Sequence, residues 1–567
     1  MDYRAEYEKW KSLSFLEKSL KDELQKIEND EEAIKNQFSC FVEFGTAGMR
    51  GTMGVGPNRM NYLTIRRTTL GLAKYIVSKG GQNAGVVITH DCRNHSRDFA
   101  TYVAKVLTEF NIKVYISKSL RPTPFLSFSV LEMKAFAGIN ITASHNRKED
   151  NGYKIYLKDG AQFSPPEDKV VIDLVNSITD EEIFVDPKNV KTNESLISII
   201  PKSVEDAFLS KALDCIIHKD FCKKFGKDIK VVYTPLHGTG YTFLKDGFKK
   251  AGFSSVYVVK AQNDENGNFK TISYPNPESA PAFDLAIKLA KEKDADICVA
   301  TDPDADRMGV YVKVAKGKYL PLTGNELSSC IFEYVSYFKK DKMNMKDALS
   351  VKSFVTTRLI DAIANNYGVE LKETPTGFKW ICKEVNKSDK KLIFACEESY
   401  GCVLSDYVRD KDSIGTTLFV CEMALALKKA GFTLYDFLHM LYMNYGVHKC
   451  YAFSTAYEGI SGKEKMSGIM NNLREKPFTK LADVNVLKVF DYSTNLVLDM
   501  KTMEKSHFDF GSTNTLKFIL DDGNTVTIRP SGTEPKIKIY FDIIDKTEEL
   551  ADNKNKILES ALRKELA

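Results

Sequence analysis

The stretch DICVATDPDADR, residues 296–307, joins a run of apolar and β-branched residues directly to a loop rich in carboxylates. The same arrangement recurs in GVVITHDCRN (85–94), AFAGINITASHN (135–146), KVVYTPLHGTG (230–240) and LIFACEESYG (392–401). Short apolar runs bounded by polar turns predict buried strands. Helical patterns separate these strands, for example over residues 282–291 and 417–429. Strands that alternate with helices predict α/β domains with largely parallel sheets.

Ligands of such sheets bind beyond the carboxyl ends of the strands, where the polar loops lie, so repeated α/β domains facing a shared cleft are expected. The C-terminal region differs, because FILDDGNTVTIRPSGTEPKIKIYFDII (518–544) has a DG turn between alternating strands and precedes a charged helical pattern. This pattern predicts a separate α+β domain. At the other end, residues 4–37 read as amphipathic helices that wrap a surface.

Composition narrows the class of protein. The chain has 567 residues, and at about 100 to 200 residues per domain it should form three to five domains. Its 80 basic and 76 acidic residues give a net charge of +4, which does not favour a nucleic-acid or membrane partner. No apolar stretch has the length of a membrane span, and the eleven cysteines show no zinc spacing. We therefore expect a cytoplasmic protein that binds a small anion.

Asp302, Asp304 and Asp306 alternate along the loop of the opening stretch. Carboxylates two residues apart on an extended segment point to one side, and they repel one another unless a cation lies between them. Hard oxygen ligands of this kind suit Mg²⁺. A calcium EF-hand is excluded, because Arg307 and Lys313 stand where its loop needs Gly and Glu. The alternative is a solvated acidic turn whose aspartates cap a helix.

The segment TIRPSGTEPK (527–536) has the composition of a phosphate site. It contains Arg529, Ser531, Gly532 and Thr533. A guanidinium, two hydroxyls and the amides of a glycine turn together form a cradle for a phosphate. An ordinary Pro-Ser-Gly turn between strands is the alternative.

CEESYG (396–401) places Glu397 and Ser399 at the end of a strand-like run. Carboxylate and hydroxyl oxygens suit hydrogen bonds to sugar hydroxyls, whereas the carboxylates would repel a phosphate. A capping glutamate or a surface turn explains the motif equally well.

Ser144 and His145 follow another strand-like run in TASHNRKEDNGYKIY (142–156), and Lys154 lies ten residues after the serine. The serine could be a nucleophile with either neighbour as its partner, or the segment could be a plain turn. A Ser-His hydrolase is excluded, because no G-x-S-x-G surrounds the serine and no acid partner is placed. The chain has no P-loop, and the glycines of FGTAGMRGTMG (44–54) have the wrong spacing for a dinucleotide, so no nucleotide cofactor is implied.

Taken together, these motifs resemble the α-D-phosphohexomutase family. The matching segments are FGTAGMRG, TASHN, NGYK, DPDADR, TPTGFKW, CEESYG, VRDKD and RPSGTEPK, in family order over about residues 40 to 540. The FGTAGMRG form and the N-terminal extension are most similar to the branch with bacterial α-phosphoglucomutases, eukaryotic phosphopentomutase and glucose 1,6-bisphosphate synthase. The resemblance implies three similar α/β domains with mixed or parallel sheets and a smaller α+β C-terminal domain around a central cleft.

The resemblance also implies roles for residues. Ser144 would carry a phosphoryl group and, with Asp302, Asp304 and Asp306, hold Mg²⁺. Arg50 and Arg307 would stabilise the transferred group, Lys154 and Lys411 would perform acid/base work, and His145 would shape the surroundings of the serine. A lysine whose pKa is lowered by nearby cations could move the proton. The implied substrate contacts are Thr46, Thr376, Gly377, Lys379, Glu397, Ser399, Arg529, Ser531, Gly532 and Thr533.

The chain departs from the family pattern at two motifs. Arg147 follows TASHN where the family commonly has Pro, which removes a backbone restraint and adds a charge. Cys396 and Tyr400 stand in CEESYG where GEESFG is frequent. Neither departure removes a group with an implied catalytic role.

The predicted domains are residues 1–195 with the phosphoserine loop, 196–315 with the metal loop, 316–455 with the sugar loop and 456–567 with the phosphate cradle. The implied reaction interconverts α-D-glucose 1-phosphate and glucose 6-phosphate, with glucose 1,6-bisphosphate as intermediate and activator. A phosphopentomutase, a phosphomannomutase, a bisphosphate synthase and, more remotely, a non-catalytic sugar-phosphate-binding protein are the alternatives. We expect sugar phosphates as partners, no nucleic acid or membrane, and a monomer or homodimer.

Overall fold

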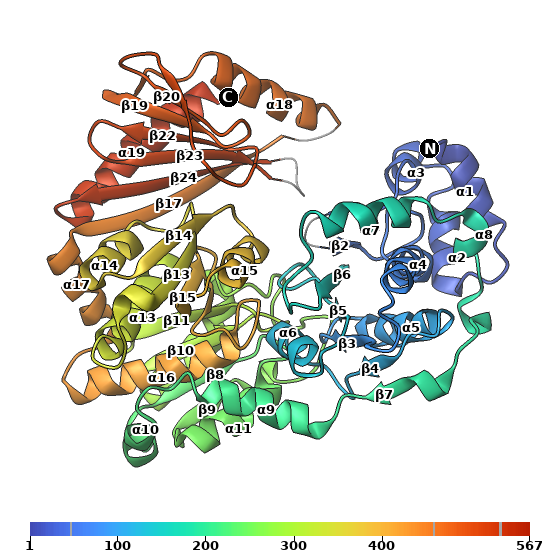
Figure 1. Ribbon diagram of the computed structural model, residues 1–567, viewed down its shortest axis with the longest axis horizontal. Helices are drawn as coiled ribbons and strands as arrows, with labels where there is room; N and C mark the ends of the chain where they lie inside the picture. Colours follow the sequence, from blue (N-terminus) through green and yellow to red (C-terminus); the bar gives the residue numbers. More distant parts are fainter. Residues whose placement is uncertain (46–47, 458–459, 532–535, 567) are drawn as a thin grey trace. The chain divides into compact units, whose positions relative to one another are not determined.

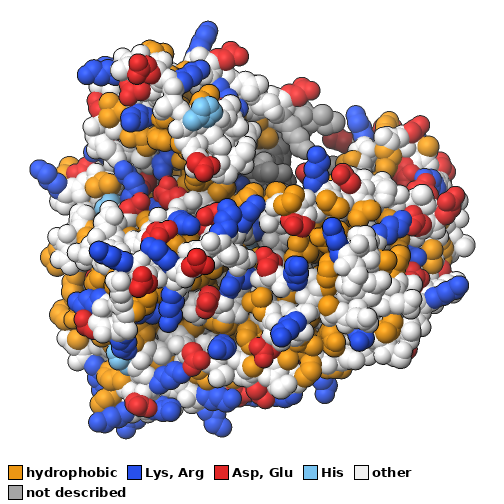
Figure 2. All heavy atoms as spheres, viewed as in Figure 1, with side chains coloured by type: hydrophobic (Ala, Val, Ile, Leu, Met, Phe, Trp, Pro, Cys, Tyr) orange, Lys and Arg blue, Asp and Glu red, His pale blue; other side chains and the backbone are white. Residues whose placement is uncertain are grey.

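The computed structural model describes residues 1–45, 48–457, 460–531 and 536–566 (Figure 1). The chain forms two compact units. Unit 1 comprises Met1–Thr323 and Tyr400–Thr433, and unit 2 comprises Gly324–Ser399 and Leu434–Ala567. Among the described residues, no helix has both the length and the apolar character needed to cross a membrane. On the face shown in Figure 2, basic and acidic side chains are interspersed.

Unit 1 begins with the amphipathic helices expected from the sequence. These are α1 (Tyr3–Lys11), α2 (Lys18–Lys26) and α3 (Glu31–Phe38), which lie beside α4 (Tyr62–Ser78) in Figure 1. Asp2 and Asp30 accept hydrogen bonds from backbone N–H groups of the first turns of α1 and α3. Tyr7, Trp10 and Phe38 are buried in the same core as the first sheet. The N-terminal helices are therefore packed into the unit through apolar contacts.

The first sheet has seven strands in the order β1-β2-β6-β5-β3-β4-β7. Their bounds are β1 (Phe44–Gly45), β2 (Gly48–Thr52), β3 (Val86–His90), β4 (Val114–Ile116), β5 (Ala137–Ile141), β6 (Asp150–Leu157) and β7 (Ile197–Ile199). Neighbours from β5 to β7 are parallel, and those from β1 to β5 are antiparallel. Every residue of β3 and β5 is buried, as their apolar runs predict. Since His90 pairs with Ile141, the loops after β3 and β5 leave the same edge.

The second sheet has the order β12-β11-β10-β8-β9. Its strands are β8 (Val231–Thr234), β9 (Val256–Val258), β10 (Ile297–Thr301), β11 (Met308–Ala315) and β12 (Lys318–Leu322). β10, β8 and β9 are parallel, whereas β11 and β12 run antiparallel to their neighbours. The carboxylate loop is the turn of the β10–β11 hairpin. Both sheets of unit 1 are therefore mixed.

Helices connect and cover these sheets. Besides α4, unit 1 has α5 (Ser96–Thr108), α6 (Thr123–Glu132), α7 (Glu167–Asn176), α8 (Asp180–Ile183), α9 (Lys202–Leu213), α10 (Lys219–Phe225), α11 (Tyr241–Ala251), α12 (Asp284–Lys293) and α16 (Ser413–Lys429), together with the short strand β16 (Gly401–Val403). α16 comes from a later part of the chain and is buried along most of its length.

Unit 2 contains a parallel α/β part and an antiparallel part. Strands β13 (Ala348–Ser353), β14 (Glu370–Thr374) and β15 (Lys391–Glu397) are parallel, with β13 between the other two. The helices are α13 (Gly324–Lys339), α14 (Leu359–Tyr367), α15 (Phe378–Lys387), α17 (Leu434–Tyr445), α18 (Ile460–Glu475) and α19 (Glu548–Glu565).

The last sheet is antiparallel, in the order β17-β24-β23-β22-β19-β20-β21, with β18 on β19. Its strands are β17 (Val447–Ala456), β18 (Lys480–Leu481), β19 (Val484–Asp491), β20 (Leu496–Asp499), β21 (Lys505–His507), β22 (Leu516–Leu520), β23 (Thr525–Pro530) and β24 (Lys536–Asp545). The DG turn joins β22 to β23, as the sequence predicts. The predicted fold class, α/β with an α+β C-terminal part, is confirmed.

Candidate active site

Ser144 lies in the loop between β5 and β6, and its side chain is buried. Its φ of +52° is in the left-handed region, which costs a non-glycine residue about 1–3 kcal/mol and persists only where the surroundings impose it. The Ser144 N–H donates to Thr142 Oγ1 at 2.9 Å, and that hydroxyl donates to Asp91 Oδ2 at 2.6 Å. The strained backbone is thus tied to the loop after β3.

Arg93, also in the loop after β3, holds the rest of the Ser144 loop. Its guanidinium is fully buried and donates to four backbone carbonyls. The acceptors are Ser144 O at 2.6 Å, Asn146 O at 2.5 Å, Arg147 O at 2.6 Å and Asp150 O at 3.0 Å. Arg93 is not among the residues predicted from the sequence, although its charge, three positions beyond the buried strand β3, was a usable signal.

β2 and the residue that follows it also contact this loop. Arg50 Nη1 donates to Asn146 Oδ1 at 3.1 Å, and Met53 N donates to Glu149 O at 2.8 Å. The structure therefore places Arg50, a predicted catalytic residue, against the serine loop. Its side chain is exposed to solvent.

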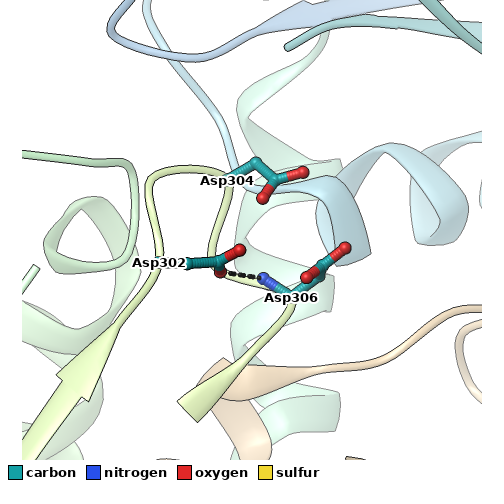
Figure 3. Close-up of side chains that lie close together, drawn as sticks. All are labelled: Asp302, Asp304 and Asp306. Carbon is teal, nitrogen blue, oxygen red and sulfur yellow. Dashed lines mark hydrogen bonds between the residues drawn. The ribbon is translucent and has the colours of Figure 1, made fainter. Parts of the chain in front are cut away.

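The three aspartates of the β10–β11 turn are buried and lie together (Figure 3). One potential ligand atom from each lies within 4.8 Å of the others. Asp302 Oδ1 accepts the N–H groups of Asp306 at 3.1 Å and Arg307 at 3.0 Å, which shapes the turn. Oδ1 of Asp304 and Oδ1 of Asp306 are buried without a hydrogen-bond partner. Buried carboxylate oxygens that lack a hydrogen bond fit a cation, so this cluster could hold a metal ion.

Ser144 reaches this cluster directly. Its Oγ donates to Asp302 Oδ2 at 2.9 Å. Burial, together with the charges of Asp304 and Asp306, raises the pKa of Asp302 well above its usual range. The carboxylates thus repel one another strongly when only protein groups surround them, as the sequence pattern predicts.

Two buried lysines face the cluster. Lys154 Nζ donates to Asp304 Oδ2 at 2.7 Å and lies 3.4 Å from Asp306 Oδ2, and Lys411 Nζ lies 3.3 Å from Asp306 Oδ2. Burial acts to lower the pKa of Lys154, but the two carboxylates outweigh it and raise the pKa above its ordinary value. The expected lowering of this pKa toward neutrality is therefore wrong for this arrangement. Carboxylates, not cations, are its nearest charged neighbours.

Lys411 is itself held by a buried pair that the sequence did not reveal. Its Nζ donates to Asp410 Oδ1 at 3.0 Å. The other oxygen of Asp410 accepts the Tyr156 hydroxyl of β6. Since all three side chains are buried, the position of the ammonium is set by packing and by hydrogen bonds.

His145 and Arg307 border the serine and the cluster. His145 Nδ1 lies 3.1 Å from Ser144 Oγ, and its ring packs edge-on against Tyr274. Burial, and then the charges of Arg307 and Arg50, lower the pKa of His145 well below its usual value, so its imidazole is neutral at pH 7. Arg307 Nη1 lies 3.4 Å from Glu278 Oε1. His145 thus contacts the serine, while Nε of Arg307 lies 3.8 Å from Asp306 Oδ1 of the cluster.

Comparison with known protein families identifies four regions of the chain that match the phosphoglucomutase/phosphomannomutase family. Residues 42–182, 208–316 and 323–445 match its α/β/α domains I, II and III, and residues 472–560 match its C-terminal domain. This chain belongs to the α-D-phosphohexomutase family. The predicted family and four-domain architecture are confirmed.

Relatives of this phosphohexomutase include phosphoglucomutase of Staphylococcus aureus (strain MRSA252), which is 36% identical over 508 residues, 89% of this chain and 90% of that protein. A putative phosphomannomutase from Thermus thermophilus has a similar fold, with a TM-score of 0.68, 22% identity and coverage of 92% of this chain and 98% of that one. N-acetylphosphoglucosamine mutase of Aspergillus fumigatus, solved in complex with GlcNAc-6P and magnesium, has a TM-score of 0.50 at 12% identity, with 93% and 96% coverage.

The other predicted contacts of this phosphohexomutase that the structure describes lie in unit 2. Glu397 is buried at the end of β15, and its Oε1 accepts the Gly377 N–H at 2.7 Å. Gly377 has a φ of +113°, which favours glycine. Thr376 and Ser399 are half-buried, and Lys379 is buried.

The predicted cradle is described only in part. Arg529 and Ser531 are half-buried at the end of β23, where Ser531 N donates to Lys536 O at 2.7 Å. Thr46, Gly532 and Thr533 lie outside the described residues. Thr376, Gly377, Lys379 and Glu397 thus share the ends of β14 and β15, while Arg529 and Ser531 belong to another sheet.

Proposed function

We propose that this phosphohexomutase interconverts α-D-glucose 1-phosphate and glucose 6-phosphate, with Ser144 as the group that accepts and returns the phosphoryl. The observation that carries the proposal is the 2.9 Å contact between Ser144 Oγ and Asp302 Oδ2. A hydroxyl that points into a carboxylate cluster becomes a phosphoryl acceptor when a cation balances the charge. The identity to a phosphoglucomutase, 36% over most of the chain, supports glucose as the sugar.

Mg²⁺ is the cation that we assign to the cluster. Asp302, Asp304 and Asp306 would hold it together with the phosphorylated Ser144, and the two buried oxygens without a hydrogen-bond partner support this assignment. When bound, the ion neutralises charge on the transferred group. The oxygen ligands are those that Mg²⁺ prefers, and a distant relative was solved with magnesium.

Cationic side chains complete the proposed site. Phosphoryl transfer depends mainly on positioning and charge neutralisation, to which Arg50 and Arg307 would contribute at the transferred oxygens. Lys154, whose ammonium lies 2.7 Å from Asp304 Oδ2, would donate a proton to a departing oxygen. Lys411 would exchange the proton of the sugar hydroxyl, while neutral His145 orients the serine hydroxyl.

The sugar contacts are proposed in unit 2. The carboxylate of Glu397 and the hydroxyl of Ser399 would bind sugar hydroxyls, assisted by Thr376, Gly377 and Lys379. Arg529 and Ser531 would bind the phosphate that is not being transferred, and Gly532, Thr533 and Thr46 remain predictions. The reaction would pass through glucose 1,6-bisphosphate, which also serves as activator. The four domain ranges, a cytoplasmic location and a monomer or homodimer likewise remain proposals.

Phosphorylation of Ser144 tests the proposed chemistry. Intact-mass analysis and peptide mapping after incubation with glucose 1,6-bisphosphate and Mg²⁺ should locate one phosphoryl group on Ser144. Ser144→Ala should bind sugar phosphate and lose nearly all turnover, whereas the exposed control Ser78→Ala should behave as wild type. A chain that never carries the phosphoryl group would instead be a sugar-phosphate-binding protein.

A coupled assay tests the choice of sugar. Glucose 1-phosphate with bisphosphate activator should give the highest kcat/KM when compared with mannose 1-phosphate and ribose 1-phosphate. A flat trace with the glucose substrate and turnover of ribose 1-phosphate would make the enzyme a phosphopentomutase. Net formation of the bisphosphate from glucose 1-phosphate and an added acyl-phosphate donor would make it a synthase.

A further inference from the structure

We propose that Arg93 is a positioning residue that holds Ser144 in its left-handed conformation and so aims the serine hydroxyl at the aspartate cluster. This inference rests on the proposed function of Ser144 as phosphoryl carrier. None of the motifs on which the family resemblance rests contains Arg93.

The first support is the number and kind of acceptors. A guanidinium presents its donors in a rigid fork, and here that fork is filled by the carbonyls of Ser144, Asn146, Arg147 and Asp150. These residues span the whole turn from β5 to β6. A lysine keeps the charge but has three donors on one nitrogen, so it cannot reproduce this pattern.

The second support is the bond to Ser144 itself. Its carbonyl is held by Arg93 at 2.6 Å and its N–H by Thr142 Oγ1 at 2.9 Å. Both backbone polar groups of the strained residue are therefore fixed from outside. Because the φ of +52° is unfavourable for serine, release of either group should let the backbone relax and move Oγ away from Asp302.

The third support is the departure at Arg147. A proline at this position would restrain the loop covalently, whereas the Arg147 side chain is exposed and its carbonyl accepts from Arg93 at 2.6 Å. The restraint on this segment is thus supplied by a side chain of the neighbouring strand loop.

Arg93 is itself fixed. Its Nε lies 3.3 Å from Asp91 Oδ2, and its guanidinium lies 5.0 Å from the centre of the Phe269 ring. Asp91 Oδ2 also accepts the Thr142 hydroxyl at 2.6 Å. Asp91 therefore couples the group that holds the Ser144 carbonyl to the group that holds its N–H.

The test compares Arg93→Lys with a matched buried arginine, Arg67→Lys. Arg67 lies on α4 in the same unit, donates to Asn176 Oδ1 and packs on Phe41. Both variants should lose thermal stability to a similar extent. In a quenched-flow experiment with glucose 1,6-bisphosphate, Arg93→Lys should phosphorylate Ser144 about 10²-fold more slowly, the effect of a misplacement of about 1 Å, with KM within about two-fold of wild type. Arg67→Lys should react at the wild-type rate.

A second variant keeps the inference testable if Arg93→Lys does not fold. Thr142→Val has nearly the same shape and removes the acceptor of the Ser144 N–H together with the hydrogen bond to Asp91 Oδ2, so it should reproduce the loss in kcat without a change in KM. Guanidinium ions added to Arg93→Gly should restore part of the phosphorylation rate.

Equal rates in Arg93→Lys and Arg67→Lys, or a rise in KM with an unchanged rate, would overturn the positioning role. That result differs from failure of the proposed function, in which wild-type Ser144 itself takes up no phosphoryl group.

Discussion

Gly238 marks the closest approach between the loop after β8 and the aspartate turn. A Cβ at this position would lie 2.3 Å from Pro303 Cα, which is backbone that cannot swing away. The neighbouring Thr239 N donates to Pro303 O at 2.8 Å, so the two loops are also joined by a hydrogen bond. Only glycine lets the first loop support the second at this distance.

We expect Gly238→Ala to displace the aspartate turn. Overpacking of this kind typically costs about 1–3 kcal/mol of stability. Because Asp302 and Asp304 flank Pro303, the change should also weaken the binding of Mg²⁺. Activity titrated with Mg²⁺ should give a raised half-saturation concentration, and thermal unfolding should give a lower Tm. Gly468→Ala, on an exposed helical position with open space around it, serves as control and should be neutral or slightly stabilising. An unchanged Mg²⁺ titration in Gly238→Ala would contradict the argument.

Single residues whose chemistry is local can be predicted from the sequence. Residues whose role depends on contacts with distant parts of the chain cannot. Asp302, Asp304 and Asp306 repel one another within one short turn, so their spacing alone predicts a cation. Arg93 acts through the Ser144 loop, and Tyr156 acts through Asp410. Each partner is distant from the residue in the chain. The effect of carboxylates on the Lys154 pKa was concealed for a related reason. Asp304 and Asp306, which raise this pKa, come from the β10–β11 turn, far along the sequence.

Among the elements, the N-terminal helices have a structural connection to the serine loop. They precede residue 42, where the family match begins. Glu23 Oε2 of α2 accepts Val55 N at 3.0 Å, and Gln37 O of α3 accepts Asn58 N at 3.0 Å. The segment thus held follows β2, whose Arg50 bonds to the serine loop. The extension therefore supports the candidate site through β2.

Glu23→Ala should weaken this support. Removing the acceptor leaves the Val55 N–H unpaired, which costs about 1–3 kcal/mol, whereas Glu23→Gln keeps an amide oxygen there and should cost less. Urea unfolding measures the difference, and the exposed neighbour Asp22→Ala is the control. Equal stabilities for the Ala and Gln variants would show that the hydrogen bond contributes nothing.

Glu23 also predicts a pH dependence. Burial raises the pKa of its carboxyl, so the folded state binds this proton more tightly than the unfolded state. Its contribution to stability is therefore complete below the unfolded pKa and is lost as pH rises through the raised folded value. Urea titrations from pH 4 to 7 should show wild-type stability falling relative to Glu23→Gln over this window. A constant difference between the two proteins would contradict the shifted pKa.

Elements with strong periodicity were predictable, and their partners were not. β3, β5 and β10 are fully buried apolar runs, as the sequence indicates. The antiparallel β11 and β12 make the second sheet mixed, because a tight carboxylate turn after β10 returns the chain as a hairpin. Strand order depends on such pairings between distant residues, which local patterns do not encode.

On the scale of the molecule, the two units do not follow the chain continuously. The segment Tyr400–Thr433 belongs to unit 1 although residues on both sides of it belong to unit 2. Glu422 of α16 accepts the N–H groups of Ile217 at 2.7 Å and His218 at 3.0 Å, which fixes the helix in unit 1. This return of the chain is what carries Lys411 to Asp306. The VRDKD motif can be recognised in the sequence, but local patterns do not show which unit it belongs to.

The two tryptophans of the chain make this division measurable, because Trp10 lies in unit 1 and Trp380 in unit 2. Trp380→Phe leaves a fluorescence reporter for unit 1, and Trp10→Phe leaves one for unit 2. The proposed Mg²⁺ ligands are all in unit 1, and a ligand at 100 times its Kd stabilises the state that binds it by about 2.7 kcal/mol. Adding Mg²⁺ to chelator-treated protein should therefore raise the urea midpoint seen by Trp10 and leave that seen by Trp380 unchanged. Asp304→Asn should abolish the shift, whereas equal shifts at both reporters would show that the units unfold as one.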